Sequence, residues 1–245
     1  MNDNCQVVWN LTSKCNQKCK FCFRKKSKDN SLDKNKKIVD KLSNLKIKTL
    51  SISGGEALLY NDIFYLLDYI KIKLPKTKLI LNTNCQGIED NMLNVIISKF
   101  DALTLPIESV DSLYNSEVGR GSKHIENVLR LLEFCNDKIE IKINTVIMKD
   151  NINQIEKIHD LIKKYNIKRW KIFRFLPIRD AKRYNNEFGI SDETSINIEN
   201  MINLINNNSD IEISYNKEKN YKTKYFIYPD GTIENSRLEP IESFL

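Results

Sequence analysis

Three cysteines lie close together near the start of the chain, and their spacing is that of an iron–sulfur ligand set. Cys15, Cys19 and Cys22 form a C-x3-C-x2-C pattern directly after an apolar stretch. Three thiolates on one loop can hold three irons of a 4Fe–4S cluster and leave the fourth iron open to another ligand. A structural zinc site is the alternative, but zinc needs four ligands. The other candidate ligands stand apart in the chain, at Cys5, His124 and His159.

Polar and glycine residues follow the next two predicted strands. Gly54, Gly55 and Glu56 come after residues 49–52, and Asn84 follows residues 78–82. Paired glycines let a ligand approach the backbone closely, and a carboxylate can pair with an ammonium group. Because functional residues in β/α barrels gather at the carboxyl ends of the strands, we expect these residues near the cysteines.

Basic residues alternate along two later predicted strands. Lys142 and Asn144 share one face of residues 139–147, and Arg169 and Lys171 share one face of residues 169–176. If that face lines the inside of a barrel, three cations converge there, and buried cations need partners. A triphosphate would supply them. The alternative is that these cations face outward, with Trp170 inward.

The elements that must position these residues alternate regularly between strands and helices. Apolar residues recur at helical spacing, as in Ile63, Leu66, Leu67 and Ile70. The predicted strands are 6–11, 49–52, 78–82, 102–106, 139–147 and 169–176. The predicted helices are 34–45, 61–73, 89–99, 122–135 and 152–165. This order predicts a parallel α/β sheet with right-handed crossovers, in the form of a partial (β/α)6 TIM-like barrel.

A change of character after Pro177 divides the chain into two predicted parts. We expect a barrel at residues 1–178 and a short C-terminal helix/hairpin extension, residues 179–245, packing on it. The extension is predicted to contain a loop at 180–190, a helix at 191–207, and a hairpin of strands 212–215 and 222–228. Residues 229–231, Pro-Asp-Gly, predict a tight turn.

Composition limits the class of protein. The chain has 245 residues, six cysteines and a net charge of +7. Clustered cysteines in a chain of this length indicate metal binding in a reducing compartment rather than a disulfide framework. We expect a cytoplasmic protein without a signal peptide or a membrane span. The basic charge is compatible with an anionic small molecule, and we expect no nucleic acid partner.

The cysteine loop with Phe21 before its last cysteine, followed by Gly54-Gly55-Glu56, resembles the radical S-adenosylmethionine (SAM) superfamily over residues 6–176. The resemblance implies a 4Fe–4S cluster on the three cysteines, SAM on the open iron, and reductive cleavage of SAM to a 5′-deoxyadenosyl radical. It also implies an external electron donor of the flavodoxin or ferredoxin type. The residues implied to contact SAM are Phe21, Gly54, Gly55, Glu56, Asn84, Arg120, Asn144 and Val146. Beyond the cluster ligands no catalytic residue is assigned.

Three later segments narrow the resemblance. Gly119-Arg120-Gly121, the run Lys142-Ile143-Asn144 and the run Arg169-Trp170-Lys171 resemble the viperin-like group, the prokaryotic SAM-dependent nucleotide dehydratases. The resemblance implies an antiviral enzyme that converts a nucleoside triphosphate to its 3′-deoxy-3′,4′-didehydro form. It also implies that Lys142, Arg169 and Lys171 bind the substrate.

Two departures keep other substrates open. Val8 stands where relatives place a polar residue near the triphosphate, and the chain ends soon after residues 225–228, where relatives continue. One alternative is a radical SAM enzyme that modifies a ribosomal peptide or another small metabolite, although the extension lacks cysteines for auxiliary clusters. The other is a non-catalytic metal-binding module.

Overall fold

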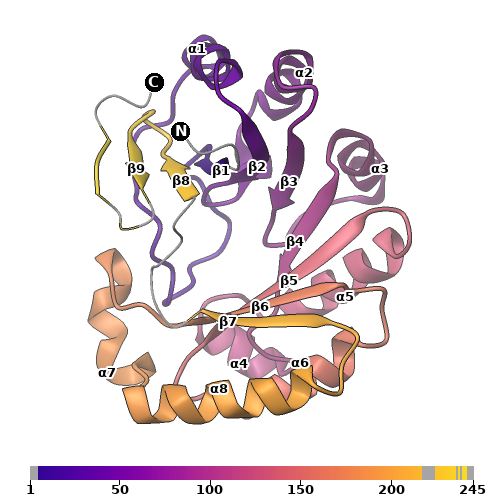
Figure 1. The fold of residues 1–245 in the computed structure, drawn as a ribbon, viewed down its shortest axis with the longest axis vertical. Helices are drawn as coiled ribbons and strands as arrows, with labels where there is room; N and C mark the ends of the chain where they lie inside the picture. The colour runs from indigo at the N-terminus through magenta and orange to yellow at the C-terminus, as the bar shows by residue number, and fades with distance from the viewer. Residues whose placement is uncertain (1–4, 217–223, 236, 238, 242–245) are drawn as a thin grey trace.

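The computed structural model describes residues 5–216, 224–235, 237 and 239–241, and these form an α/β fold around one curved sheet (Figure 1). The strand order is β7-β6-β5-β4-β3-β2-β1-β8-β9, and every neighbouring pair is parallel except β8 and β9. The strands are β1 (Cys5–Asn10), β2 (Ile47–Ser53), β3 (Lys78–Asn82), β4 (Ala102–Pro106), β5 (Glu140–Ile147), β6 (Arg169–Arg174), β7 (Glu212–Asn216), β8 (Lys224–Ile227) and β9 (Ile233–Asn235).

Helices cover the outer, convex side of this sheet (Figure 1). The α-helices are α1 (Leu32–Ser43), α2 (Ile63–Lys73), α3 (Asp90–Lys99), α4 (Ser112–Glu117), α5 (His124–Cys135), α6 (Gln154–Ile162), α7 (Asn185–Phe188) and α8 (Asp192–Asn206). Two 3₁₀ helices, η1 (Ala57–Leu59) and η2 (Arg179–Tyr184), lie between them. Each long helix turns an apolar stripe towards the sheet, as Val128, Leu131 and Leu132 of α5 do.

The fold class predicted from the sequence is confirmed. Six strand–helix units follow one another in a parallel sheet, and β3 and β4 have the predicted bounds. Helix α4 was not predicted, because its six residues are too few to show a periodic pattern. It begins after Asp111, whose carboxylate accepts hydrogen bonds from the Leu113 and Tyr114 amides (2.8 and 3.3 Å).

The predicted pairing within the extension was wrong. Strand β7 pairs with β6, where Glu212 lies beside Arg169, and β8 pairs with β1, where Lys224 lies beside Gln6. The two strands therefore extend opposite ends of the sheet, and each covers an edge that a six-stranded sheet would leave unpaired. The real hairpin joins β8 to β9 through the predicted turn at 229–231. Residues 222–223 of the predicted strand lie outside the described residues.

Two further features of the extension differ in part from expectation. The predicted loop at 180–190 contains most of η2 and all of α7. Helix α8 matches the predicted helix, and the Ser191 hydroxyl caps it by accepting a hydrogen bond from the Thr194 amide (3.0 Å). The boundary between residues 178 and 179 stays a prediction, since the extension adds strands to the same sheet.

Strand alternation separates an outer face from an inner one. On β5, Ile141, Ile143 and Ile147 are buried towards the helices, whereas Lys142 and Asn144 are half-buried on the opposite, concave face. On β6, Trp170 is fully buried on the helix side, and its indole N–H donates to Thr145 Oγ1 (2.8 Å). We call the concave face, opposite to the helices, the inner face.

Candidate functional site

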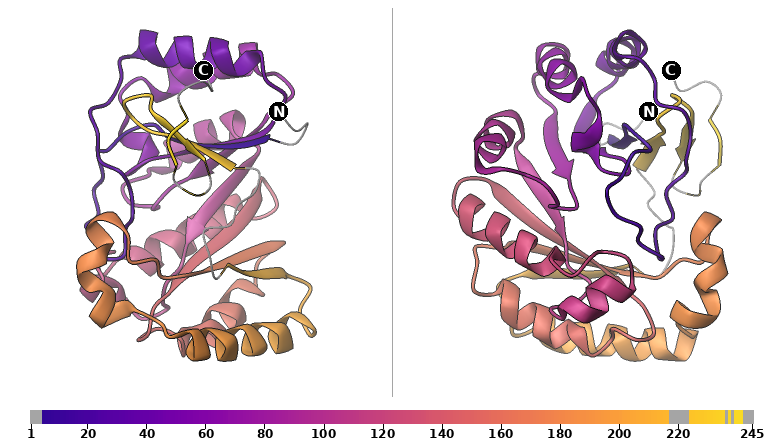
Figure 2. Two further views of the ribbon diagram at one scale, coloured as in Figure 1. Left: turned by 60° about the vertical axis from the view of Figure 1, so that its left-hand side comes forward. Right: turned by 180° about the vertical axis from the view of Figure 1, so that it is seen from behind.

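The cysteine loop, residues 12–22, starts at the carboxyl end of β1 and is held by backbone hydrogen bonds. The Lys18 amide donates to the Gly119 carbonyl (3.1 Å) and the Lys20 amide to the Val118 carbonyl (3.0 Å). On its other side, the Glu56 amide donates to the Lys14 carbonyl (2.8 Å). The segment from β1 to α1 runs across the open side of the sheet as far as α7 (Figure 2), where Lys20 pairs with Glu187 (3.0 Å).

Two glycines allow this close approach. A Cβ at Gly55 would lie 2.2 Å from the Lys14 carbonyl oxygen, and one at Gly119 would lie 2.2 Å from the Lys18 carbonyl oxygen. Gly119 also has a φ of +86°, in the region that favours glycine. The loop that carries the cysteines therefore rests on backbone that no other residue type could provide.

The three cysteines suit a cluster rather than a single ion. All three cysteine residues are partly exposed. In the described part of the chain, no three His, Cys, Asp or Glu side chains converge closely enough to hold one metal ion. A cluster makes no such demand, since each thiolate meets a different iron. Burial raises the pKa of the Cys19 thiol to about 11, so a metal bound there would have to displace a proton.

Glu56 and Asn84 join the ends of β2 and β3 beside this loop. The Glu56 carboxylate is buried and accepts hydrogen bonds from the Asn84 amide (2.6 Å) and the Leu58 amide (3.3 Å). Burial raises the pKa of this carboxyl, and the two hydrogen bonds oppose that shift. The Asn84 side-chain amide donates to Asn16 Oδ1 (2.6 Å) and points to Cys15 Sγ (3.8 Å). The structure thus brings these two predicted residues to the cysteines.

Arg120 connects the loop after α4 to the cysteine loop. Its guanidinium forms a two-pronged ion pair with the buried Glu108 carboxylate (2.7 and 2.9 Å) and donates to Gln17 Oε1 (3.1 Å). It also lies over the Phe21 ring, 5.1 Å from the ring centre. Planar guanidinium groups suit such combined pairing and stacking. Phe21 itself is buried in a small apolar cluster and anchors the loop.

His124, the first residue of α5, is a buried neutral side chain next to this ion pair. Its Nε2 donates to the Pro106 carbonyl (3.1 Å). Burial, reinforced by the charge of Arg120, lowers the pKa of His124 to about 3. It therefore holds a helix start in place and carries no positive charge near neutral pH.

A group of lysines lies on the inner face. The structure brings the predicted Lys142 and Lys171 together, and it adds Lys224 from β8; we call these three the lysine group. Burial, followed by the positive charges of Lys171 and Lys142, lowers the pKa of Lys224 from 10.5 to about 8. The pKa of Lys171 is also lowered, by burial and then by Lys142 and Arg169. Burial is the main cause of both pKa shifts, and the charges of the neighbouring cations add to it.

Charged residues border the lysine group. Glu140 accepts from Lys142 (3.1 Å) and also from Lys78, at the amino ends of their strands. Arg169 lies at the edge of the group, half exposed, and pairs with Glu212 (2.8 Å). The inner face also carries Asn144 and Val146 on the half of β5 that is nearer the cysteine loop.

Sequence reasoning missed three residues of this site. Lys224 was not predicted as a site residue, because the sequence analysis paired β8 with β7 in a hairpin. In the structure β8 lies beside β1. Gln17 looked like an ordinary loop residue, although it is buried against Arg120. Glu108 follows a strand end, the usual place for a functional residue, and was given no firm role.

The fold and the cysteine loop define a class of protein. Residues 9–162 match the Radical SAM superfamily, and the chain belongs to it. Solved structures agree in fold: Streptococcus suis SuiB bound to S-adenosylmethionine has a TM-score of 0.77 at 19% identity, over 94% of this chain and 59% of that chain. The anSMEcpe structure with bound AdoMet has a TM-score of 0.74 at 15% identity, over 98% of this chain and 76% of that chain.

Within this superfamily, the chain is similar to proteins named S-adenosylmethionine-dependent nucleotide dehydratase. That of Psychrobacter lutiphocae is 28% identical over 72% of this chain and 66% of its own length. That of Flammeovirga pacifica is 30% identical over 71% of this chain and 63% of its own length. The chain therefore spans just under two thirds of the length of these relatives. None of its described helices is long and apolar enough to cross a membrane.

Proposed function

We propose that this protein is a radical SAM enzyme that dehydrates a nucleoside triphosphate to its 3′-deoxy-3′,4′-didehydro form. The observation that carries this proposal is the lysine group on the inner face of a barrel whose rim holds the cysteine loop. The names of the similar nucleotide dehydratases support the same substrate class.

The rim residues would hold the cofactors. Cys15, Cys19 and Cys22 would ligate a 4Fe–4S cluster, and Glu56, Asn84 and Arg120 border the space beside the loop. When bound, the cluster and SAM would supply a 5′-deoxyadenosyl radical that abstracts hydrogen from the substrate ribose. Arg120 is held in one orientation by Glu108, so a carboxylate arriving at this rim would meet a positioned cation.

The lysine group would hold the triphosphate. A phosphate chain would bring negative charge to this half-buried basic face. Lys142 is fixed by Glu140, which limits its reach, whereas burial, followed by the neighbouring positive charges, lowers the pKa of Lys171 and Lys224. A bound phosphate chain would raise both pKa values again and would place the nucleoside towards the rim.

Anaerobic reconstitution with iron, sulfide, SAM and reductant tests the proposal. A screen of nucleoside triphosphates should find one that increases 5′-deoxyadenosine release and yields a product lighter by one water. Release that no triphosphate stimulates would contradict the substrate. Protein that binds iron but never cleaves SAM would indicate a non-catalytic metal-binding module.

A peptide or another small metabolite is the second candidate substrate. Val8 and Phe226 are register neighbours on β1 and β8, half-buried beside the lysine group, and this apolar patch favours a less polar ligand. A structure of SuiB with its precursor peptide SuiA shares the fold, with a TM-score of 0.77. SAM cleavage coupled to a peptide and indifferent to triphosphates would support this candidate.

A further inference from the structure

A glutamine on the cysteine loop carries a buried donor without a partner. Gln17 stands between Cys15 and Cys19 in the sequence and is only 6% exposed. Within the part of the chain that the structure describes, its side-chain nitrogen Nε2 is buried and forms no hydrogen bond. Buried polar groups without a partner are rare and unfavourable in folded proteins. Nε2 therefore marks a place where a bound group can supply the missing acceptor.

The orientation of the Gln17 carboxamide is set by Arg120. The guanidinium donates to Gln17 Oε1 (3.1 Å), and because a guanidinium can only donate hydrogen bonds, the atom that faces it is the oxygen. Arg120 is held in turn by its two-pronged ion pair with Glu108 (2.7 and 2.9 Å). A carboxamide whose oxygen accepts from a cation becomes a stronger donor at its nitrogen. The contacts from Glu108 through Arg120 thus make Nε2 a fixed and polarised donor.

Two of the three cysteine sulfurs contact Gln17. Its backbone amide donates to Cys15 Sγ (3.5 Å), and Cys19 Sγ lies 3.6 Å from Oε1. Nε2 is bonded to the same carbon as Oε1, so it also lies near Cys19. The Cys19 thiol donates as well to the Gly119 carbonyl oxygen (3.7 Å). A sulfur that ligates iron has no hydrogen to donate to these two oxygens and can only accept, and Nε2 can donate to such a sulfur.

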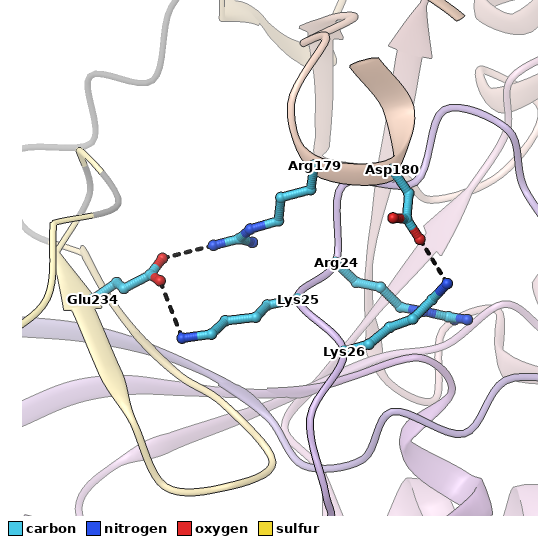
Figure 3. Close-up of a pocket in the computed structure, with 6 residues that line it drawn as sticks. All are labelled: Arg24, Lys25, Lys26, Arg179, Asp180 and Glu234. Carbon is cyan, nitrogen blue, oxygen red and sulfur yellow. Dashed lines mark hydrogen bonds and ion pairs between the residues drawn. The ribbon is translucent and has the colours of Figure 1, made fainter. Parts of the chain in front are cut away.

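Contacts away from Gln17 hold the loop in place. After the last cysteine, Arg179 donates to the Phe23 carbonyl (3.0 Å) and pairs with Glu234 of β9 (2.8 Å). Lys26 pairs with Asp180 (2.6 Å), so two ion pairs hold the segment that follows the cysteine loop (Figure 3). They add to the backbone hydrogen bonds of the loop itself. A substitution at residue 17 should therefore change the surroundings of the sulfurs without displacing them.

We propose that Gln17 donates a hydrogen bond from Nε2 to a sulfur atom of the 4Fe–4S cluster and so raises the reduction potential of the cluster. Hydrogen bonds to the sulfurs are among the factors that set such potentials. Reduction adds negative charge to the sulfurs, so a donor stabilises the reduced cluster more than the oxidised one. This inference rests on the cluster of the proposed function and is independent of the substrate.

Potentiometric titration of the anaerobically reconstituted protein, without SAM, tests the proposal. In Gln17→Leu, which loses the donor at similar volume, the ratio of reduced to oxidised cluster at a fixed potential should fall about tenfold. For a one-electron couple this corresponds to a midpoint potential lower by about 59 mV. Gln17→Glu keeps an oxygen for Arg120 but loses the donor and adds a negative charge, so it should lower the potential at least as far.

Gln86→Leu is the matched control. It makes the same substitution at an exposed side chain, on a residue whose backbone carbonyl accepts a hydrogen bond from Asn16 of the cysteine loop (3.2 Å). This variant should leave the potential unchanged. A midpoint potential does not depend on the fraction of the protein that carries a cluster, so partial loss of iron in a variant does not affect the comparison.

Equal midpoint potentials for Gln17→Leu and Gln86→Leu would overturn the proposal. An unchanged potential together with weaker SAM binding by Gln17→Leu would overturn it too, because Nε2 would then donate to SAM rather than to the cluster. Both of these results leave the proposed function intact. Unaltered protein that binds no iron would contradict the proposed function, and this inference with it.

Discussion

The cysteine loop and the lysine group are held in place in different ways. Backbone hydrogen bonds and two close glycine contacts fix the loop, so its position depends on particular residues at particular places. The lysine group is placed only by strand alternation and by the pairing of β8 with β1. The loop is therefore ordered before any ligand arrives, whereas burial and then like charge lower the pKa of Lys171 and Lys224 in the lysine group.

The largest expected effect is loss of the cluster through a single thiol. Cys19→Ala should retain much less iron after anaerobic reconstitution and should release no 5′-deoxyadenosine, because an open cluster needs all three protein ligands. Cys135→Ala is the matched control, since Cys135 is buried in α5 among apolar side chains. Normal iron content and normal SAM cleavage in Cys19→Ala would show that the cysteine loop does not hold the cluster.

A comparison of two glycines tests how the loop is held. Gly119 and Gly121 both have positive φ, but a Cβ at Gly121 would meet nothing within 4 Å. Gly121→Ala should cost only about 1 kcal/mol of left-handed strain. Gly119→Ala adds a clash with the cysteine loop and should cost about 2–4 kcal/mol, as measured by urea unfolding. Equal losses of unfolding free energy in the two variants would mean that the close contact of Gly119 with the Lys18 carbonyl does not contribute to stability.

Removing charge from the lysine group should have opposite effects on binding and stability. Lys171→Met and Lys224→Met should each weaken tripolyphosphate binding about tenfold. Lys171→Met should also raise the free energy of unfolding of the ligand-free protein by about 1 kcal/mol, because binding residues are often destabilising. Lys168→Met, on the exposed turn before β6, is the control for both measurements. A loss of stability in Lys171→Met would contradict an unfavourable burial of this charge.

The smallest expected effect is a dependence on pH that Lys224 confers. Its ammonium is lost above about pH 8 in the ligand-free protein, so tripolyphosphate binding should weaken as the pH rises from 7 to 9. Between about pH 8 and 10.5 the unfolded chain binds more protons at this position than the folded one. The contribution of Lys224 to stability should therefore become less unfavourable as the pH rises. Superimposable binding profiles for Lys224→Met and the unaltered protein would exclude this role.

Local patterns predicted the loop better than they predicted the lysine group. The cysteine spacing and Gly54-Gly55-Glu56 are contiguous motifs, and the alternation of Lys142 with Ile141 and Ile143 gives the correct face of β5. The position of Lys224 depends on which strand lies beside β1, and a turn signal alone cannot specify a partner more than 200 residues away. The Arg120–Glu108 pair was missed for another reason: the two residues lie on either side of α4, which was not predicted.

The pairing of β8 with β1 has a consequence for the order of folding. Strand β1 leads directly into the cysteine loop, and its second neighbour, β8, is synthesised more than 200 residues later. Pairings between segments so distant in sequence form late, because a long loop must close first. During synthesis, the strand beneath the cysteines therefore has one open edge until the ribosome has released residues 224–227. Iron and sulfide are therefore best delivered after β8 has paired with β1.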